Sequence, residues 1–201
     1  TITSSSGAVS QWNDKSSNAN HVATAIAGEK PVTNSATING LNAIAFAGTD
    51  DVLKKETGVT GMPDNNNVTI LTVRRHNSGT SGGVFCGLRT ASSNDVYKIG
   101  RDAGNMVAGG NGTSGSGTTQ ASVADADNTN PILWSATYAD TVSRRELFKN
   151  GLSVGTNTAD ISAQAAADKL YIGFMLKKNG EKMKLGTTFV PSIPADAEIS
   201  P

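Results

Sequence analysis

GLNAIAFAGTDDVL, at residues 40–53, sets the pattern for the whole chain: a short apolar run, a glycine, two adjacent aspartates and then apolar residues again. Ile44 and Phe46 lie two positions apart, so on a β-strand their side chains share one face. The glycine and the Asp50-Asp51 pair turn the chain out of that strand. The stretch therefore predicts a strand followed by a polar corner.

The composition fits a chain of many short strands and turns. Charged residues make up 17% of the 201 residues, against roughly 25% in typical globular proteins, and there are 22 glycines. We expect one domain over residues 1–201, because all-β domains often reach this length as a single unit. The 17 basic and 17 acidic residues cancel, so no overall field favours nucleic acid or an anionic membrane, and we expect neither as a partner.

Further strands are predicted on both sides of this stretch. The segment Val68 to His76 has apolar residues on both faces, which is typical of an interior strand, and we expect its Arg74-Arg75 end to emerge into solvent. Asn39-Gly40 and Asn150-Gly151 are pairs suited to two-residue hairpin turns. The remaining strands are expected at residues 82–88, 95–102, 131–140, 144–149, 152–155, 170–176 and 184–193.

Strands at roughly 8–12-residue spacing with almost no helix are the pattern of a β-sandwich or jelly roll. Short helical turns are expected only at residues 162–169 and 194–201. We therefore predict an all-β, two-sheet antiparallel jelly-roll sandwich. The residues expected to fill its core are Trp12, Ile44, Phe46, Ile70, Phe85, Trp134, Tyr138, Phe148 and Ile172.

Four blocks of sequence carry a resemblance to a known family. They are WNDKSSNANH (12–21), NGLNAIAFAGTDDVL (39–53), ATYADTVSRRELFKNGLSVG (136–155) and LYIG (170–173). In this order they resemble the concanavalin A-like, laminin-G-like domains of bacterial and phage surface proteins. The resemblance implies a concanavalin A-like sandwich.

The sequence departs from that family at several points. Ser17, Asn42 and Ala139 stand where the family usually has glycine, proline and aspartate. The family also tends to have a strand before the position of Thr1, and its last strand differs from the one here. We expect this edge to be truncated, or completed by another part of a longer protein or by a second subunit, which leaves a homo-oligomer open.

The fold hosts lectins, glycan hydrolases, adhesion modules and structural parts, so it does not decide the function. The hydrolases of this superfamily that cleave β-glucans carry an E-x-D-x-E run, and this chain has none. Its glutamates are scattered, and neither its two histidines nor Cys86 lies in a nucleophile motif. We therefore predict that the chain is not an enzyme. The glutamates are Glu29, Glu56, Glu146, Glu181 and Glu198.

Two non-catalytic functions are then open. The favoured one is a structural or adhesion module of a virion, such as a fibre or decoration domain, or of a cell surface. The alternative is a carbohydrate-binding, receptor-binding module whose rim loops hold a sugar, with the loops around Asp50 and at residues 109–119 as the places to look. The expected partners are other surface subunits or a cell-surface glycan, at a virion surface or outside the cell.

Asp50 and Asp51 are the one candidate metal site, because hard carboxylate oxygens are what calcium takes. Calcium needs six or more oxygens, so carbonyls and waters would have to supply the rest. Capping the corner by accepting backbone N–H bonds is the favoured role for the pair. For His21 a role in a turn is favoured over metal ligation, and the segment from Asp125 lacks the third ligand and the glycine of a calcium loop.

The chain opens TITSSSGAVS, without an initiator Met or a secretory signal pattern. We expect it to be one module, or a processed part, of a longer protein. Its apolar runs are too short to span a bilayer, so membrane insertion is not predicted.

Overall fold

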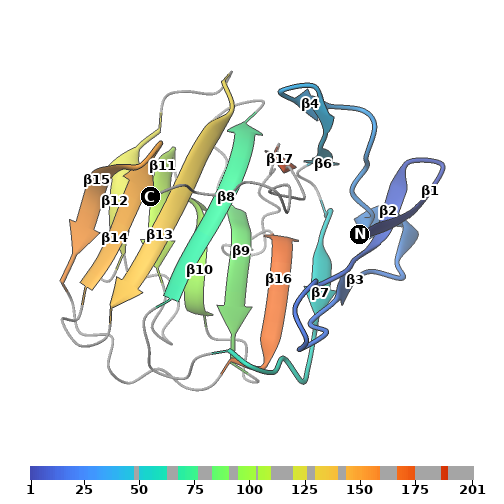
Figure 1. The fold of residues 1–201 in the computed structure, drawn as a ribbon, viewed down its shortest axis with the longest axis horizontal. Coiled ribbons are helices and arrows are strands. Elements are labelled where there is room, and N and C mark those ends of the chain that lie inside the picture. The colour runs from blue at the N-terminus through green and yellow to red at the C-terminus, as the bar shows by residue number, and fades with distance from the viewer. Residues whose placement is uncertain are drawn as a thin grey trace.

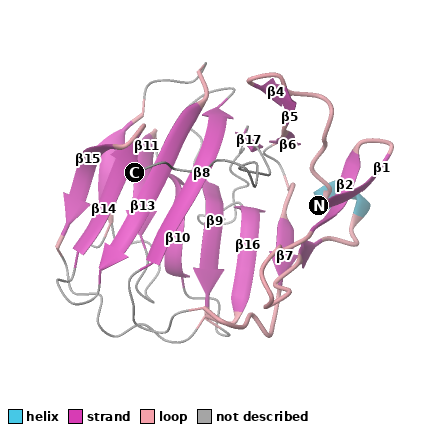
Figure 2. Ribbon diagram, viewed as in Figure 1, coloured by secondary structure: helices cyan, strands magenta, loops and turns pink. Residues whose placement is uncertain are grey.

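The computed structural model describes residues 1–47, 50–62, 68–76, 83–90, 95–102, 104–109, 120–125, 130–139, 144–158, 167–174 and 187–189. Their regular secondary structure consists of strands and one short 3-10 helix, η1 (Ala27–Glu29), joined by loops and turns (Figure 2). The strands form two large antiparallel sheets that lie one over the other, with β13 and β8 in front of β10 and β9 (Figure 1). The predicted all-β sandwich is confirmed.

The larger sheet has nine strands, in the order β1-β2-β3-β7-β16-β9-β10-β11-β12. Their bounds are β1 (Ile2–Ser5), β2 (Ala8–Trp12), β3 (Val22–Ala23), β7 (Leu53–Lys55), β16 (Lys169–Phe174), β9 (Gly83–Arg89), β10 (Asp95–Asp102), β11 (Asn105–Gly109) and β12 (Ala121–Ala124).

The second sheet has six strands, in the order β15-β14-β13-β8-β17-β6, and a small hairpin pairs β4 with β5. Their bounds are β15 (Leu152–Asn157), β14 (Arg144–Lys149), β13 (Ile132–Ala139), β8 (Val68–His76), β17 (Thr187–Phe189), β6 (Ile44–Phe46), β4 (Thr37–Ile38) and β5 (Leu41–Asn42).

The stretch at residues 40–53 is the crossing between the two sheets. Ile44 and Phe46 in β6 are both buried, as their spacing predicts, and so is Leu53 at the start of β7. Strand β6 belongs to the six-stranded sheet and β7 to the nine-stranded sheet. The polar corner between them therefore carries the chain across the core.

A second link closes the same side of the sandwich. Val32 exchanges backbone hydrogen bonds with Ala45 of β6, at 2.9 and 2.7 Å. Its neighbours bond to β2 and the turn before it: Val9 donates to the carbonyl of Pro31, and Thr33 donates to that of Gly7, both at 2.8 Å. One extended segment thus ties an edge of the six-stranded sheet to the nine-stranded sheet.

The core lies between the sheets and largely matches the prediction. Ile44, Phe46, Ile70, Phe85, Trp134 and Tyr138 are buried, and Trp12 and Ile172 are partly buried against them. Phe148 is the exception. It alternates along β14 with the inward-facing Arg145 and Leu147, so its half-buried side chain lies on the outer face of the sheet.

The hydroxyl of Tyr138 joins the two sheets inside this core. It donates to the carbonyl of Lys98 and lies 3.0 Å from the carbonyl of Gly109, while the backbone N–H of Lys98 donates to it at 3.3 Å. The ring also meets that of Tyr97 edge to face, with centroids 5.0 Å apart. A buried phenol needs such partners, because an unsatisfied hydroxyl inside the core is costly.

The predicted exposure of the Arg74 end of β8 is wrong. Arg74 is 1% exposed and forms a buried ion pair with Asp125. Its guanidinium also lies 4.5 Å from the ring centroid of Phe85 and 5.7 Å from that of Trp134. Residues 68, 70, 72 and 74 alternate onto the inner face of the strand, so the arginine enters the core with them.

The predicted hairpin turns are confirmed. Asn39 and Gly40 have φ of 50° and 75°, and Asn150 and Gly151 have φ of 51° and 82°, as a type I′ turn requires at both central residues. A further hairpin, β1–β2, was not predicted and turns at Ser6-Gly7. The helical turns expected at 162–169 and 194–201 fall on residues that lie mostly outside the described ranges.

The WNDKSSNANH block folds into a loop organised by Asp14. Its carboxylate accepts hydrogen bonds from the backbone and hydroxyl of Ser16 and from the backbone of Asn20, and these bonds lower the pKa of Asp14. Asn20 is buried and bonds to both backbone groups of Thr60. The block is therefore a structural loop joined to the segment after β7.

Candidate functional site

The Asp50-Asp51 corner was the candidate metal site, and its second aspartate is nearly buried. Asp51 is 8% exposed, and its Oδ2 accepts a hydrogen bond of 2.5 Å from the backbone N–H of Ala47, four residues earlier. Burial raises the pKa of Asp51 against the effect of this bond, and the Asp50 charge adds to the rise. The carboxylate thus caps the corner where the chain leaves β6.

Asp50 is exposed and lies beside η1, where a Cβ placed on Gly28 would be 3.9 Å from its Oδ2. Among the described residues, no three His, Cys, Asp or Glu side chains are placed to hold one metal ion. We propose that the corner is structural, with calcium binding at Asp50 and Asp51 as the less favoured alternative that the following experiment tests.

Calcium is expected to leave the melting temperature of the chain equal to the value measured in chelator, because Asp51 already bonds to the backbone. A ligand that binds only the folded state must raise that temperature. A rise in calcium that is lost in both Asp50→Asn and Asp51→Asn would assign a metal to this corner and contradict the structural role.

A second set of polar side chains lies on the outer face of the nine-stranded sheet. Strand register places Ala23, Lys54, Tyr171 and Gly87 side by side, on β3, β7, β16 and β9. Directly opposed residues share a face, and the alternation with the buried Leu53 turns Lys54 and Tyr171 away from the core.

Lys54 and Tyr171 belong to a continuous set of side-chain contacts, which we call the charged network. Lys54 Nζ lies 3.5 Å from Glu29 and 3.4 Å from Glu56, and Tyr171 donates a hydrogen bond of 2.7 Å to Glu56. The guanidinium of Arg89 lies 5.5 Å from the ring centroid of Tyr171. The members are Thr24, Glu29, Lys54, Glu56, Arg89 and Tyr171, with Thr24 donating to Glu29 at 2.9 Å.

The network is open to solvent at its centre. The side chains of Glu56, Lys54 and Glu29 are 51%, 26% and 21% exposed, whereas Tyr171 is 5% exposed as a residue. The buried phenol therefore holds Glu56 in place, and the carboxylate and ammonium groups beside it remain accessible.

The protonation states within the network are fixed near neutral pH. Burial opposes ionisation of Glu56, but the hydrogen bond from Tyr171 and the Lys54 ammonium outweigh it and lower the pKa of Glu56. Burial and the neighbouring Glu56 raise the pKa of Tyr171 to about 12. Glu56 is thus a carboxylate and Tyr171 a neutral phenol.

The sequence did not reveal this site. Glu29 and Glu56 were among the glutamates interpreted as scattered, because 27 positions separate them in the chain. They meet through Lys54, since η1 leads back to β7: the backbone N–H of Val52 donates to the carbonyl of Glu29 at 2.9 Å. The only feature of the sequence that pointed to this site was Tyr171, a polar aromatic residue inside the LYIG block.

The other candidates have structural positions. His21 accepts a hydrogen bond of 3.0 Å at Nδ1 from the backbone of Asp14, in the turn where it was expected. Burial raises the pKa of the Cys86 thiol to about 11. Of the loop at residues 109–119, only Gly109 is among the described residues. Helices of the length and apolar character needed to cross a bilayer are absent from the described ranges.

No family model and no curated protein matches the sequence, but solved structures share its fold. The mouse laminin α1 chain, domains LG4-5, matches at a TM-score of 0.51 and 17% identity, over 72% of this chain and 38% of that one. The binding domain of botulinum neurotoxin DC, solved in complex with SialylT, matches at 0.53 and 11%, over 90% and 45%.

A sialidase of Trypanosoma rangeli, solved in complex with sialic acid, matches at a TM-score of 0.53 and 12% identity. The match covers 92% of this chain and 30% of the sialidase. This chain thus spans less than half the length of each of the three. Likeness at such low identity shows the fold alone, which is an antiparallel β-sandwich.

Proposed function

We propose that this chain is a non-catalytic, glycan-binding module of a surface protein, acting in adhesion or receptor binding at a virion or a cell surface. The observation that carries the proposal is the charged network on the outer face of the nine-stranded sheet. It presents hydrogen-bond acceptors on Glu29 and Glu56 and a donor on Lys54, all partly open to solvent. A few convergent polar groups on a rigid support are typical of ligand sites.

Rigidity supports this function over a purely structural one. Lys54 and Tyr171 stand on paired strands, and the hydrogen bond from Tyr171 fixes the carboxylate of Glu56. Groups held in place before binding lose little conformational freedom when the ligand arrives. The sequence alone favours a structural or adhesion module, whereas the charged network supports the alternative, a carbohydrate-binding module.

The protonation states support a non-catalytic role. A hydrolase needs one carboxyl group with a raised pKa as its general acid, whereas the pKa of Glu56 is lowered. A tyrosine that acts as a base needs a lowered pKa, whereas that of Tyr171 is raised to about 12. Both shifts favour a site that binds without transferring protons.

The related structures agree with this proposal at the level of the fold. The botulinum toxin domain was solved with a sialylated ligand, and the sialidase with sialic acid. The matches cover 45% and 30% of those two chains, so the function of this chain has to be argued from its own site.

A glycan array probed with the folded chain, in calcium and again in chelator, tests the function. We expect saturable binding to one class of glycan, with the same result in both conditions, because no member of the charged network is part of the Asp50-Asp51 corner. Silence on a sample that unfolds cooperatively would overturn the binding function. The remaining function would then be a structural role among neighbouring subunits.

A further inference from the structure

The charges of the network alternate in sign along its length. Glu29 and Glu56 are acidic, and Lys54 lies between them within 3.5 Å of both. Arg89 follows on the far side of Tyr171. The two acidic and two basic members of the network cancel, and Lys169 adds a positive charge close enough to help lower the pKa of Glu56. The site therefore combines strong donors and strong acceptors side by side.

This pattern suits hydroxyl groups better than carboxylates. Each sugar hydroxyl is both a donor and an acceptor, so adjacent hydroxyls can donate to Glu56 and accept from Lys54 at the same time. Hydrogen bonds to charged groups are shorter and roughly twice as strong as neutral ones. The 3.4 Å separation between Lys54 Nζ and Glu56 Oε1 places such a donor and acceptor side by side.

An acidic sugar would fit less well. The most exposed carboxylate of the network is Glu56, at 51%, and a further acidic residue, Asp50, lies beside Gly28 of η1. A carboxylate on the ligand that took the place of a hydroxyl at Glu56 would meet a like charge, and like charges placed together at an interface are costly. The Arg89 guanidinium is, moreover, stacked on Tyr171.

We propose that the charged network binds an uncharged saccharide through its hydroxyl groups, with Glu56 and Lys54 as the principal contacts. This inference rests on the proposed glycan-binding function and names its site and ligand class. It separates this chain from the structural neighbours that were solved with sialic acid or a sialylated ligand.

The test is calorimetric titration of the full chain with methyl glycosides of mannose, galactose and glucose, beside N-acetylneuraminic acid and galacturonic acid. We expect binding of at least one neutral glycoside and of neither acid. Glu56→Gln, which keeps the shape and removes the charge, should weaken that binding about tenfold, the loss expected when a charged hydrogen bond becomes neutral.

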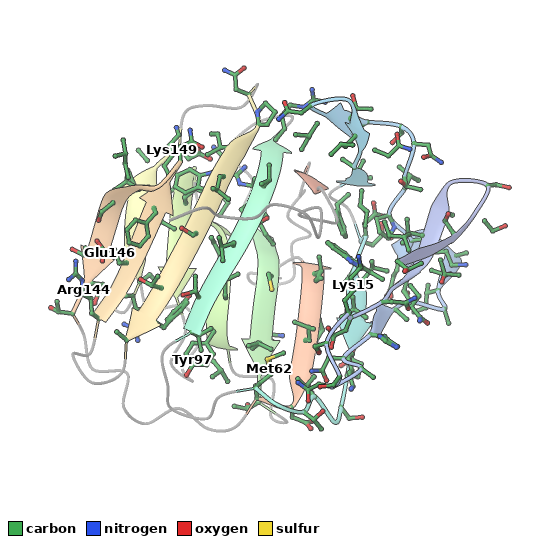
Figure 3. The ribbon with its side chains drawn as sticks, viewed as in Figure 1. Lys15, Met62, Tyr97, Arg144, Glu146 and Lys149 are labelled. Atoms are coloured by element: carbon green, nitrogen blue, oxygen red, sulfur yellow. The ribbon has the colours of Figure 1, made fainter. Side chains whose placement is uncertain are left out.

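The matched control is Glu146→Gln. Glu146 is also ion-paired, with Arg144 at 2.8 Å, but it lies on β14, on the other side of the molecule from β7 (Figure 3). Its change should leave binding unaltered. Binding of only the acidic sugars would overturn the neutral-ligand inference and leave the proposed function standing. If a neutral glycoside binds and Glu56→Gln leaves its affinity unchanged, the charged network is not the binding site. If no sugar binds, in the titrations or on the array, both this inference and the proposed glycan-binding function are wrong.

Discussion

Asp125→Ala is expected to lower the free energy of unfolding by about 3–5 kcal/mol, the usual cost of removing one partner of a buried ion pair. Arg74 is 1% exposed and would be left with its charge in the core between Phe85 and Trp134. In a chain of this size the melting temperature should fall by roughly 6–20 °C. Urea unfolding and calorimetry measure both quantities.

Two further variants show whether the loss in Asp125→Ala comes from leaving the buried charge of Arg74 without its partner. Glu146→Ala breaks a partly exposed pair, in which the side chains of Arg144 and Glu146 are 47% and 16% exposed, and removes the acceptor of a hydrogen bond from Ser153. It should cost no more than about 1 kcal/mol. The double variant Arg74→Met/Asp125→Leu replaces the buried pair by apolar groups and should regain most of the loss. An Asp125→Ala protein as stable as Glu146→Ala would show that the buried pair does not hold the sheets together.

Gly173→Ala is expected to destabilise the fold by about 2–4 kcal/mol, since it combines backbone strain with overpacking. Gly173 has φ of +77° within β16, and a Cβ there would lie 2.1 Å from the ring of Phe46. The absence of a side chain at Gly173, in the LYIG block, thus leaves room for the ring of Phe46, in the stretch at residues 40–53. Denaturant unfolding of the variant measures the loss.

The matched control is Gly151→Ala, at φ of +82° in the β14–β15 turn with nothing within 4 Å of the new Cβ. It carries the backbone strain alone and should cost about 1–2 kcal/mol. Adding Phe46→Leu to Gly173→Ala should give a smaller total loss than the sum of the two single changes, because the side chain that clashes is removed. Equal costs for the two glycine variants would rule out the contact with Phe46.

The local features of the fold could be predicted because they depend on neighbouring residues. The alternation of Ile44 and Phe46, the turn pairs at Asn39 and Asn150, and the extent of β8 all follow from spacing and turn chemistry. The Ser6-Gly7 hairpin was missed because only one short apolar pair, Ala8 and Val9, marks its second strand. Strand β1 pairs there by backbone hydrogen bonds, which polar residues form equally well.

What could not be predicted depends on contacts between distant parts of the chain. Arg74 looked like a solvated strand end because its partner, Asp125, is 51 positions away. The charged network could not be predicted for the same reason, because Tyr171 and Glu56 are 115 positions apart. They meet only because β16 pairs with β7 in one particular register. A shift of that register by one residue would turn Tyr171 into the core.

Glycan affinity in the Glu56→Gln variant, compared with that of Glu146→Gln, tests whether the charged network is the glycan-binding site. Titration of both variants with the glycan that the unmodified chain binds should show a roughly tenfold loss for Glu56→Gln. Glu146→Gln should keep the original affinity, and the two proteins should unfold at similar temperatures. Equal affinities in the two variants would show that Glu56 does not contact the glycan and would place the glycan site elsewhere on the sandwich.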